Sequence, residues 1–310
     1  MITLNYPEIP AEKKLVAATG FFDGVHAGHQ AILCNIVDEA KRQNKKSCVV
    51  TFWPHPRVVL SKDAETLRLL TTIDEKTEII SKLGINYFYL IPFTQKFSQL
   101  SAKQFFHNIL IDKINISQLY IGYNHHFGHN ARAGFDEIKK TGMKFNVDVF
   151  KTDEISCGRH KISSTIIRKL LETGDIEKAN SMLGYDYCLQ GIVVHGNRIG
   201  RTLGFPTANI QPNAYKMIPQ NGVYAVKVKI KNIEYNGMLN IGLRPTLNNT
   251  EKSIIEVNIF DFDEDIYDIT ISVKILKRIR NEQFFASLDL LKNQLKQDEL
   301  TIRKILIDNG

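Results

Sequence analysis

The sequence has few cysteines and no long apolar run. Its four cysteines lie far apart and form no CxxC pair, which argues against a structural zinc site and against a disulfide framework. Isolated thiols are typical of proteins in a reducing cytoplasm. No segment reaches the ~18 consecutive apolar residues of a membrane-spanning helix, and the first residues lack the apolar core of a signal peptide. We therefore expect a cytoplasmic protein without a membrane segment.

The composition is that of an ordinary globular protein. Of the 310 residues, 43% are hydrophobic and 24% are charged, unlike disordered or fibrous chains. At roughly 100 to 200 residues per domain, this length predicts two domains. The 40 Lys and Arg residues against 33 Asp and Glu residues give a net charge of +7. That charge favours an anionic ligand, and it fits nucleic acids and small phosphates equally well.

The pattern of apolar residues changes once along the chain. Between residues 14 and 183, apolar runs such as LVAATGFF and SCVVTFW alternate with stretches of helical periodicity, which predicts a parallel sheet with helices on its faces. Further on, strands such as GVYAVKVKI alternate apolar and polar residues, which predicts a small antiparallel barrel or sandwich. Apolar residues at helical spacing between 284 and 307 predict a terminal helix that caps it. We place the domains at residues 1–185 and 186–310.

The segment TGFFDGVHAGHQAIL follows a predicted strand and opens a predicted helix. A helix N-terminus attracts phosphate because its first N–H groups have no acceptor within the helix. His26 and His29 share one helix face, and Gly20, Gly24 and Gly28 permit a ligand to approach the backbone closely. The alternative is a pair of surface histidines without a ligand.

A second segment, KISSTIIRKLLETG, places three hydroxyl residues at a helix start: Ser163, Ser164 and Thr165. Arg168 lies one turn further along the same helix. Hydroxyls, N–H groups and a guanidinium suit phosphate oxygens, although such a run on its own is usually an N-cap. Together the two segments predict a nucleotide site.

Four motifs of the first half, GxFDGxHxGH, TFWPHP, LTTIDEK and ISSTIIR, resemble the adenylyltransferase module of bacterial bifunctional riboflavin kinase/FAD synthetases. The resemblance implies a nucleotidyltransferase-like α/β fold, with a Rossmann-like parallel sheet, that transfers AMP from ATP to the phosphate of FMN. The residues it implies for ATP binding are Gly20, Phe22, Asp23, Gly24, His26, His29, Asn124, Ser163, Ser164, Thr165 and Arg168.

The resemblance implies catalytic roles for His26, His29 and Arg168. The two histidines contact the ATP phosphates, and Arg168 lies with Ser164 on the side where pyrophosphate leaves. The acceptor is a phosphate monoester, which is already anionic at pH 7 and needs no base to act as a nucleophile. Positioning and charge neutralisation can therefore suffice.

Two features depart from the family pattern in this half. Phe21 stands where the family more often has Asn, and the loop from Gly128 to Gly134 is slightly longer. These departures concern the flavin side of the site rather than the type of reaction. The histidines at 125, 126 and 129 are not interpreted as a metal site, because no cysteine lies nearby and paired loop histidines are usually not ligands.

The second domain contains another glycine-rich stretch, VVHGNRIGRTLGFPTANI. It lacks the Walker sequence GxxxxGK[ST], and it lies among antiparallel strands rather than in a Rossmann unit. Its glycines can expose backbone N–H groups to phosphate, and the oxygens of Thr207 and Asn209 suit Mg²⁺. The alternative is an ordinary hairpin connection. Further on, Glu256 alternates with apolar residues, which places a carboxylate opposite an apolar row.

Five motifs, GRxxGFPTAN, NGVYAV, NIGLRPT, IEVNIFDFDEDIY and RNEQFF, resemble the riboflavin kinase module of the same family. The resemblance implies a six-stranded barrel in which Thr207 and Asn209 hold Mg²⁺ and phosphate. It also implies that Glu256 is the base acting on the ribityl 5′-hydroxyl of riboflavin. The remaining residues that it implies are Gly200, Arg201 and Gly204 for ATP, and Arg280 and Phe284 for the flavin.

Two positions depart from the kinase pattern. Asn258 replaces a frequent His, which removes an ionisable group beside the proposed base. Asp268 replaces a frequent Gly, and because Asp tolerates positive φ better than most residues, we expect this turn to form.

The leading hypothesis is a bifunctional enzyme that phosphorylates riboflavin to FMN and then adenylylates FMN to FAD. It uses Mg²⁺ with ATP, holds no tightly bound prosthetic group, binds neither nucleic acid nor membrane, and is a monomer or weak oligomer. One alternative is a riboflavin kinase with a degenerate adenylyltransferase domain. Another is a basic flavin- or nucleic-acid-binding regulator, suggested by the net charge and LKRIR; that segment alternates like a strand and lacks interleaved aromatic residues.

Overall fold

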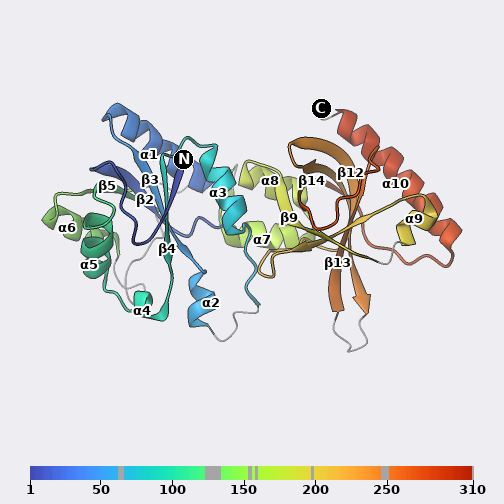
Figure 1. The fold of residues 1–310 in the computed structure, drawn as a ribbon, viewed down its shortest axis with the longest axis horizontal. Coiled ribbons are helices and arrows are strands. Elements are labelled where there is room, and N and C mark those ends of the chain that lie inside the picture. The colour runs from blue at the N-terminus through green and yellow to red at the C-terminus, as the bar shows by residue number, and fades with distance from the viewer. Residues whose placement is uncertain are drawn as a thin grey trace. The chain divides into compact units, whose positions relative to one another are not determined.

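The alternating strands and helices of the N-terminal half build a six-stranded parallel sheet (Figure 1). The computed structural model describes residues 1–61, 66–122, 134–152, 156–157, 160–196, 199–245 and 251–308. The sheet contains β1 (Ile2–Asn5), β2 (Leu15–Thr19), β3 (Ser47–Trp53), β4 (Tyr87–Pro92), β5 (Ile116–Ile121) and β6 (Asp148–Lys151). Its order is β1-β4-β3-β2-β5-β6, so the direction of chain progression reverses between β2 and β5.

Helices cover both faces of this sheet, as the sequence pattern predicts. The helices of this half are α1 (Ala27–Arg42), α2 (Pro56–Leu60), α3 (Ile73–Ser81), α4 (Gln95–Ser98), α5 (Ala102–Phe105), the π-helix η2 (Phe106–Ile111) and α6 (Phe135–Lys144). Apolar residues of α1 and α3 pack on one face, and those of α5, η2 and α6 pack on the other. A short hairpin follows, formed by β7 (Ser156–Cys157) and β8 (His160–Lys161). The prediction of a parallel α/β domain is confirmed.

The C-terminal half forms a closed six-stranded antiparallel barrel in the order β10-β13-β12-β11-β14-β9. Its strands are β9 (Tyr187–Val194), β10 (Ala208–Pro212), β11 (Gly222–Ile230), β12 (Ile233–Pro245), β13 (Glu251–Ile259) and β14 (Thr270–Arg280). Tyr224, Val226 and Val228 of β11 are fully buried, as their alternation with lysines predicts. The turn before β14 also forms as expected, since Asp268 adopts a φ of +59°.

Two helices cover the outer face of the barrel, α9 (Ile199–Leu203) and α10 (Leu288–Asp308). Ile302 and Leu306 of α10 are buried in a cluster with residues of β11 and β12, so the prediction of a capping terminal helix is confirmed (Figure 1). The helix begins four residues later than the apolar spacing indicated, and Phe284 and Leu288 are exposed. Among the described residues, no helix is long and apolar enough to cross a membrane.

The internal contacts divide the chain into two units, Met1–Ser164 and Thr165–Gly310. Two helices precede the barrel strands, α7 (Ser164–Thr173) and α8 (Ile176–Leu183). Asn180 of α8 donates from Nδ2 to the carbonyl oxygen of Ile275 in β14 at 2.9 Å. The backbone N–H of Gln220 donates to the carbonyl oxygen of Leu171 in α7, also at 2.9 Å. These helices therefore pack with the barrel, while a functional boundary between residues 185 and 186 stays a prediction.

Candidate active sites

The first candidate site lies where β2 ends and α1 begins. β2 and β5 are the neighbouring strands at which the sheet order reverses, and ligands of open α/β sheets bind at the carboxyl ends of such strands. The turn between β2 and α1 carries His26 as the N-cap of α1. The histidine motif predicted from sequence thus stands at the end of the sheet where a nucleotide site is expected.

His26 and His29 form a stacked pair at this helix start. Their ring centroids are 3.7 Å apart, with an interplanar angle of 15°, and the backbone N–H of His29 donates to Nδ1 of His26 at 3.3 Å. Burial lowers the pKa of His26 to about 4 against an opposing effect of Asp23, and burial also lowers the pKa of His29 well below its usual value. Both rings are therefore neutral at pH 7, and the proton of His26 resides on Nε2 because Nδ1 is an acceptor.

Nδ1 of His29 is a buried polar atom without a hydrogen-bond partner among the described residues. Phe22 packs edge-on against the His29 ring, with centroids 5.3 Å apart and an interplanar angle of 82°, so this aromatic residue orients the histidine. Gly20 leaves room for the ring of Phe22, since an added Cβ at position 20 would lie 3.2 Å from Cζ of Phe22. Phe22 and Gly20, both implied by the family motif, therefore shape the site.

Asp23 binds the segment that leads into α3. Its carboxylate accepts hydrogen bonds from the backbone N–H of Leu70 at 3.0 Å and of Thr71 at 3.2 Å. The N–H of Gly24 donates in turn to Oγ1 of Thr71 at 3.0 Å. Asp23 is 6% exposed, so the geometry points to a role in fixing the turn.

Ser164 joins this turn across a long sequence separation. Its hydroxyl donates to the carbonyl oxygen of Asp23 at 2.9 Å, which brings the start of the ISSTIIR helix beside the histidine turn. Ser163 is partly buried, Thr165 is exposed, and Arg168 is partly buried one turn along α7. Asn124 lies outside the described residues.

The second candidate site lies on the barrel around the residues that follow α9. The backbone N–H of Phe205 donates to the carbonyl oxygen of Gly200 at 2.8 Å, and Gly204 permits the reversal with a φ of +84°. A Cβ at Gly200 would overlap the carbonyl oxygen of Phe205 and lie 3.3 Å from Oγ1 of Thr207. The glycines of this motif therefore let the chain fold closely around Thr207. Arg198 lies outside the described residues.

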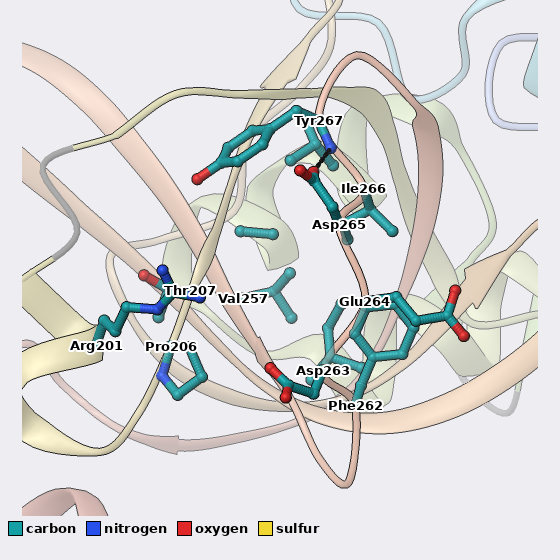
Figure 2. A pocket seen from close by; sticks show the side chains of 13 residues that line it. Arg201, Pro206, Thr207, Val257, Phe262, Asp263, Glu264, Asp265, Ile266 and Tyr267 are labelled. Carbon is teal, nitrogen blue, oxygen red and sulfur yellow. Dashed lines mark hydrogen bonds between the residues drawn. The ribbon is translucent and has the colours of Figure 1, made fainter.

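Two cavities meet at Thr207. Cavity A, of about 330 Å³, is lined by Arg201 on one side and by the loop from Phe262 to Tyr267 on the other (Figure 2). Cavity B, of about 340 Å³, is lined by Glu256 together with apolar side chains. Those apolar residues are Leu203, Phe205, Val223, Met238, Ile254, Phe285, Leu291 and Leu295. Thr207 lines both cavities, so ligands in the two cavities would approach each other at this residue.

A row of polar residues crosses the barrel beside this junction. Asn209 on β10 pairs with Glu256 on β13, and Glu256 pairs with Asn240 on β12. Side chains at directly paired positions of antiparallel strands lie on the same face. A Cβ at Gly196 would overlap the amide of Asn209, so this glycine makes room for that side chain. Glu256 and Asn240 of this row line cavity B, and Asn209 continues the row onto β10.

Asn258, one of the residues that depart from the family pattern, supports the loop before Thr207. It is 7% exposed, and its Nδ2 donates to the carbonyl oxygen of Pro206 at 2.7 Å. Because the side-chain amide of Asn258 does not titrate, this hydrogen bond does not depend on pH. The sequence shows this exchange but not the bonding partner of Asn258, because Pro206 lies 52 residues away in the chain.

The two residues implied for flavin binding have different surroundings. Arg280 lines cavity B, and its guanidinium donates to the carboxylate of Asp298 in α10. Phe284 is 95% exposed and is absent from the lining of both cavities. The neighbouring Phe285 lines cavity B and lies 5.7 Å from the Arg280 guanidinium. Of these two adjacent phenylalanines, Phe285 lines the cavity, and flavin binding by Phe284 stays a prediction.

Comparisons with known proteins divide the chain into two matched regions. The family model for FAD synthetase matches residues 8–166, and the model for riboflavin kinase matches residues 183–306. A solved structure from Streptococcus pneumoniae, described as a macrolide-efflux protein, is 32% identical. It covers 98% of this chain and 99% of its own, with a TM-score of 0.88.

Relatives of established description are similar along almost the whole chain. The bifunctional riboflavin kinase/FMN adenylyltransferase of Bacillus subtilis (strain 168) is 37% identical, covering 93% of this chain and 91% of its own. The corresponding protein of Escherichia coli (strain K12) is 36% identical, covering 97% and 95% respectively. Both identities extend over more than 90% of this chain, so the similarity covers both domains. The chain therefore belongs to the family of bifunctional riboflavin kinase/FMN adenylyltransferases, which make FAD from riboflavin with ATP.

Proposed function

We propose that the two activities of this family divide between the two candidate sites, with riboflavin phosphorylated at the barrel and FMN adenylylated at the histidine turn. The observation that carries the first assignment is the position of Thr207, which lines both cavities. Phosphoryl transfer requires the donor nucleotide and the acceptor alcohol to meet in line. Two cavities that share Thr207 as a lining residue support such a meeting.

In this proposal cavity B holds the isoalloxazine of riboflavin and cavity A holds ATP. The apolar lining of cavity B suits a flat aromatic ring system. In cavity A the cationic Arg201 lies on the same side as Thr207, which suits the phosphates. The acidic residues of the opposite loop repel phosphate, so this side of cavity A suits the uncharged adenine ring of ATP, whose amino group can donate hydrogen bonds to carboxylates. The ribityl chain would then extend toward Thr207.

Glu256 is the proposed base of the kinase step. An alcohol is a weak nucleophile until its proton is accepted, so this step needs a carboxylate within reach. As the 5′-oxygen forms its bond to the γ-phosphorus, the bond from phosphorus to the bridging oxygen of ADP breaks and Glu256 takes the hydroxyl proton. Asn209 and Asn240, on either side of Glu256 in the strand register, would hold neighbouring oxygens.

Thr207 and Asn209 would also hold the Mg²⁺ that accompanies ATP. Their hydroxyl and amide oxygens are the hard ligands that Mg²⁺ prefers, and the close packing of Gly196 against the Asn209 amide orients that ligand. Bound Mg²⁺ would neutralise the negative charge on the phosphate oxygens of ATP.

For adenylyl transfer, the neutral His26 would donate from Nε2 to a phosphate oxygen of ATP. His29 and the first N–H groups of α1 provide further donors, and Ser163, Ser164, Thr165 and Arg168 belong to the pyrophosphate side. An oxygen of the FMN phosphate attacks the α-phosphorus, and the bond to pyrophosphate breaks. We propose no base for this step, because the attacking phosphate is already ionised.

The test is to follow riboflavin or FMN with Mg·ATP by chromatography with fluorescence detection. Wild-type protein should convert riboflavin to FMN and then FAD. Glu256→Gln should stop FMN formation and still convert added FMN to FAD, whereas His29→Ala should do the reverse. FMN without FAD in the wild type would instead favour a kinase with an inactive first site, and loss of both activities in a folded single variant would contradict the division of sites.

The remaining expectations stand as proposals beside this one. They are a monomeric or weakly oligomeric enzyme, a cytoplasmic location, no nucleic-acid partner and no tightly bound prosthetic group. Sedimentation of the purified protein over a range of concentrations, and absorbance near the flavin bands after desalting, would test the first and the last.

A further inference from the structure

Lys76 is a buried lysine beside the first site, and it has no role in either proposed reaction. It lies on α3 with 5% exposure, on the same face as the fully buried Ile80. Lysine is almost never this buried unless its ammonium has a partner. Here Nζ donates to the carbonyl oxygen of Phe21 at 2.6 Å, so the lysine contacts the backbone of the histidine turn.

The turn that Lys76 contacts has a strained backbone. Phe22 has a φ of +47° and the β-branched Val25 has a φ of +35°, values that residues with a Cβ rarely adopt. Such conformations persist where the surrounding structure holds them. The bonds from α3 and its leading segment do this: Lys76 binds the carbonyl of Phe21, and Leu70 and Thr71 bind the carboxylate of Asp23.

The bond to Phe21 also sets which way the next N–H points. The peptide bond between Phe21 and Phe22 is trans, so its C=O and N–H point in opposite directions. With the carbonyl turned toward Lys76, the N–H of Phe22 is turned away from α3. Burial lowers the pKa of Lys76 to about 8 while the Asp23 carboxylate raises it, so the amine carries a positive charge at pH 7.

We propose that Lys76 is a positioning residue for adenylyl transfer: by holding the Phe21 carbonyl, it keeps the strained turn in the conformation that presents His26 and the backbone donors to the ATP phosphates. This inference rests on the proposed function of that turn. It requires no contact between Lys76 and ATP. Its buried positive charge also makes the region behind the turn more favourable for a polyphosphate.

The test compares Lys76→Met with Lys82→Met. Lys82 follows the same helix and pairs with Glu78 on the surface at 2.8 Å, so its loss controls for removing a lysine from α3. Adenylyl transfer is measured forward from FMN and ATP and backward from FAD and pyrophosphate, since the backward assay starts without ATP for the kinase. Folding of this unit is followed through the fluorescence of Trp53, the one tryptophan of the chain, at the end of β3.

We expect Lys76→Met to lower kcat/KM for ATP and for pyrophosphate by on the order of 10- to 100-fold, as small displacements of positioning groups do. Riboflavin phosphorylation and the Trp53 unfolding transition should persist, Lys82→Met should resemble the wild type, and Lys76→Arg should be intermediate. Adenylyl transfer by a folded Lys76→Met within about twofold of Lys82→Met would overturn the proposal.

Two further outcomes decide the remaining cases. If Lys76→Met loses the Trp53 transition, Lys76→Arg decides: a raised KM for ATP in a folded protein supports positioning, and an unchanged KM overturns it. If neither the wild type nor Lys82→Met makes FAD from FMN, the proposed function itself fails, and the Lys76 proposal fails with it. A defect confined to Lys76→Met cannot be confused with that result.

Discussion

Arg280 at the end of β14 and Asp298 in α10 form a nearly buried ion pair. Nε of Arg280 donates to the two carboxylate oxygens at 3.1 and 3.0 Å, and Nη2 donates at 2.8 Å. The Arg280 and Asp298 side chains are 15% and 2% exposed, and Gln294 donates to the same carboxylate at 2.9 Å. This contact holds α10, which supplies Leu291 and Leu295 to cavity B, against the barrel.

Arg280→Met should therefore destabilise the barrel unit strongly. Removing one partner leaves the Asp298 carboxylate buried without its counter-charge, which costs about 3–5 kcal/mol of the free energy of unfolding. Urea denaturation followed by circular dichroism measures this loss, and KM for riboflavin should rise because the wall of cavity B loosens.

Lys274→Met is the control for that substitution. Its pair with Glu234 is 41% and 37% exposed, so its loss should cost less than about 1 kcal/mol. Equal losses for the two variants would show that Arg280 contributes no more than a surface lysine.

Asn258→Asp should slow the kinase step without changing the size of the side chain. A carboxylate cannot donate to the carbonyl oxygen of Pro206, so the two oxygens repel and the loop that carries Thr207 shifts. We expect on the order of a tenfold lower rate of FMN formation at pH 8. The rate should partly recover as pH falls, because a protonated carboxyl group can donate and burial raises its pKa.

Asn180→Asp is the control, since Asn180 also donates from Nδ2 to a backbone carbonyl and lines neither cavity. Its Nδ2 donates to Asp186 Oδ1 at 3.3 Å as well, so the two substitutions are compared by the pH profile of FMN formation and not by stability. It should retain the wild-type pH profile of FMN formation. If Asn258→Asp and Asn180→Asp show the same pH profile of FMN formation, Asn258 does not position the loop that carries Thr207.

His26 makes the stability of the first unit depend on pH. Its pKa is about 4 in the folded protein and about 6.5 in an unfolded chain, so between these values the unfolded state binds the extra proton. Stability contributed by the neutral ring is thus fully present above pH 6.5 and is lost as pH falls toward 4. At pH 5 the loss is on the order of 2 kcal/mol.

His26→Asn should weaken this acid dependence. Asparagine remains a good N-cap that can accept from the N–H of His29, but it does not titrate. Urea unfolding of both proteins, followed by Trp53 fluorescence at pH 7.5 and pH 5, compares their losses. Parallel losses would show that His26 is not the group responsible.

The fold could be read from sequence because its signals are local. The period of GVYAVKVKI predicted β11, and the helical pattern of residues 26–42 predicted α1 with His26 at its start. The edge strand β1 was not predicted, since four residues with little burial carry no clear period. The packing of α7 and α8 with the barrel was also not predicted, because helical periodicity shows which face is apolar and not what covers it.

The sequence by itself determined the two glycine-rich turns, the residue types around them and the division into a parallel sheet and a barrel, because turn chemistry and side-chain periodicity act over a few residues. Only the tertiary structure decided which side chains meet. It placed Thr207 at the junction of two cavities, turned Arg280 toward Asp298, brought Phe285 rather than Phe284 to cavity B, and buried Lys76 beneath the histidine turn. These contacts join residues far apart in the chain, and a burial or a hydrogen bond exists only once both partners are in place.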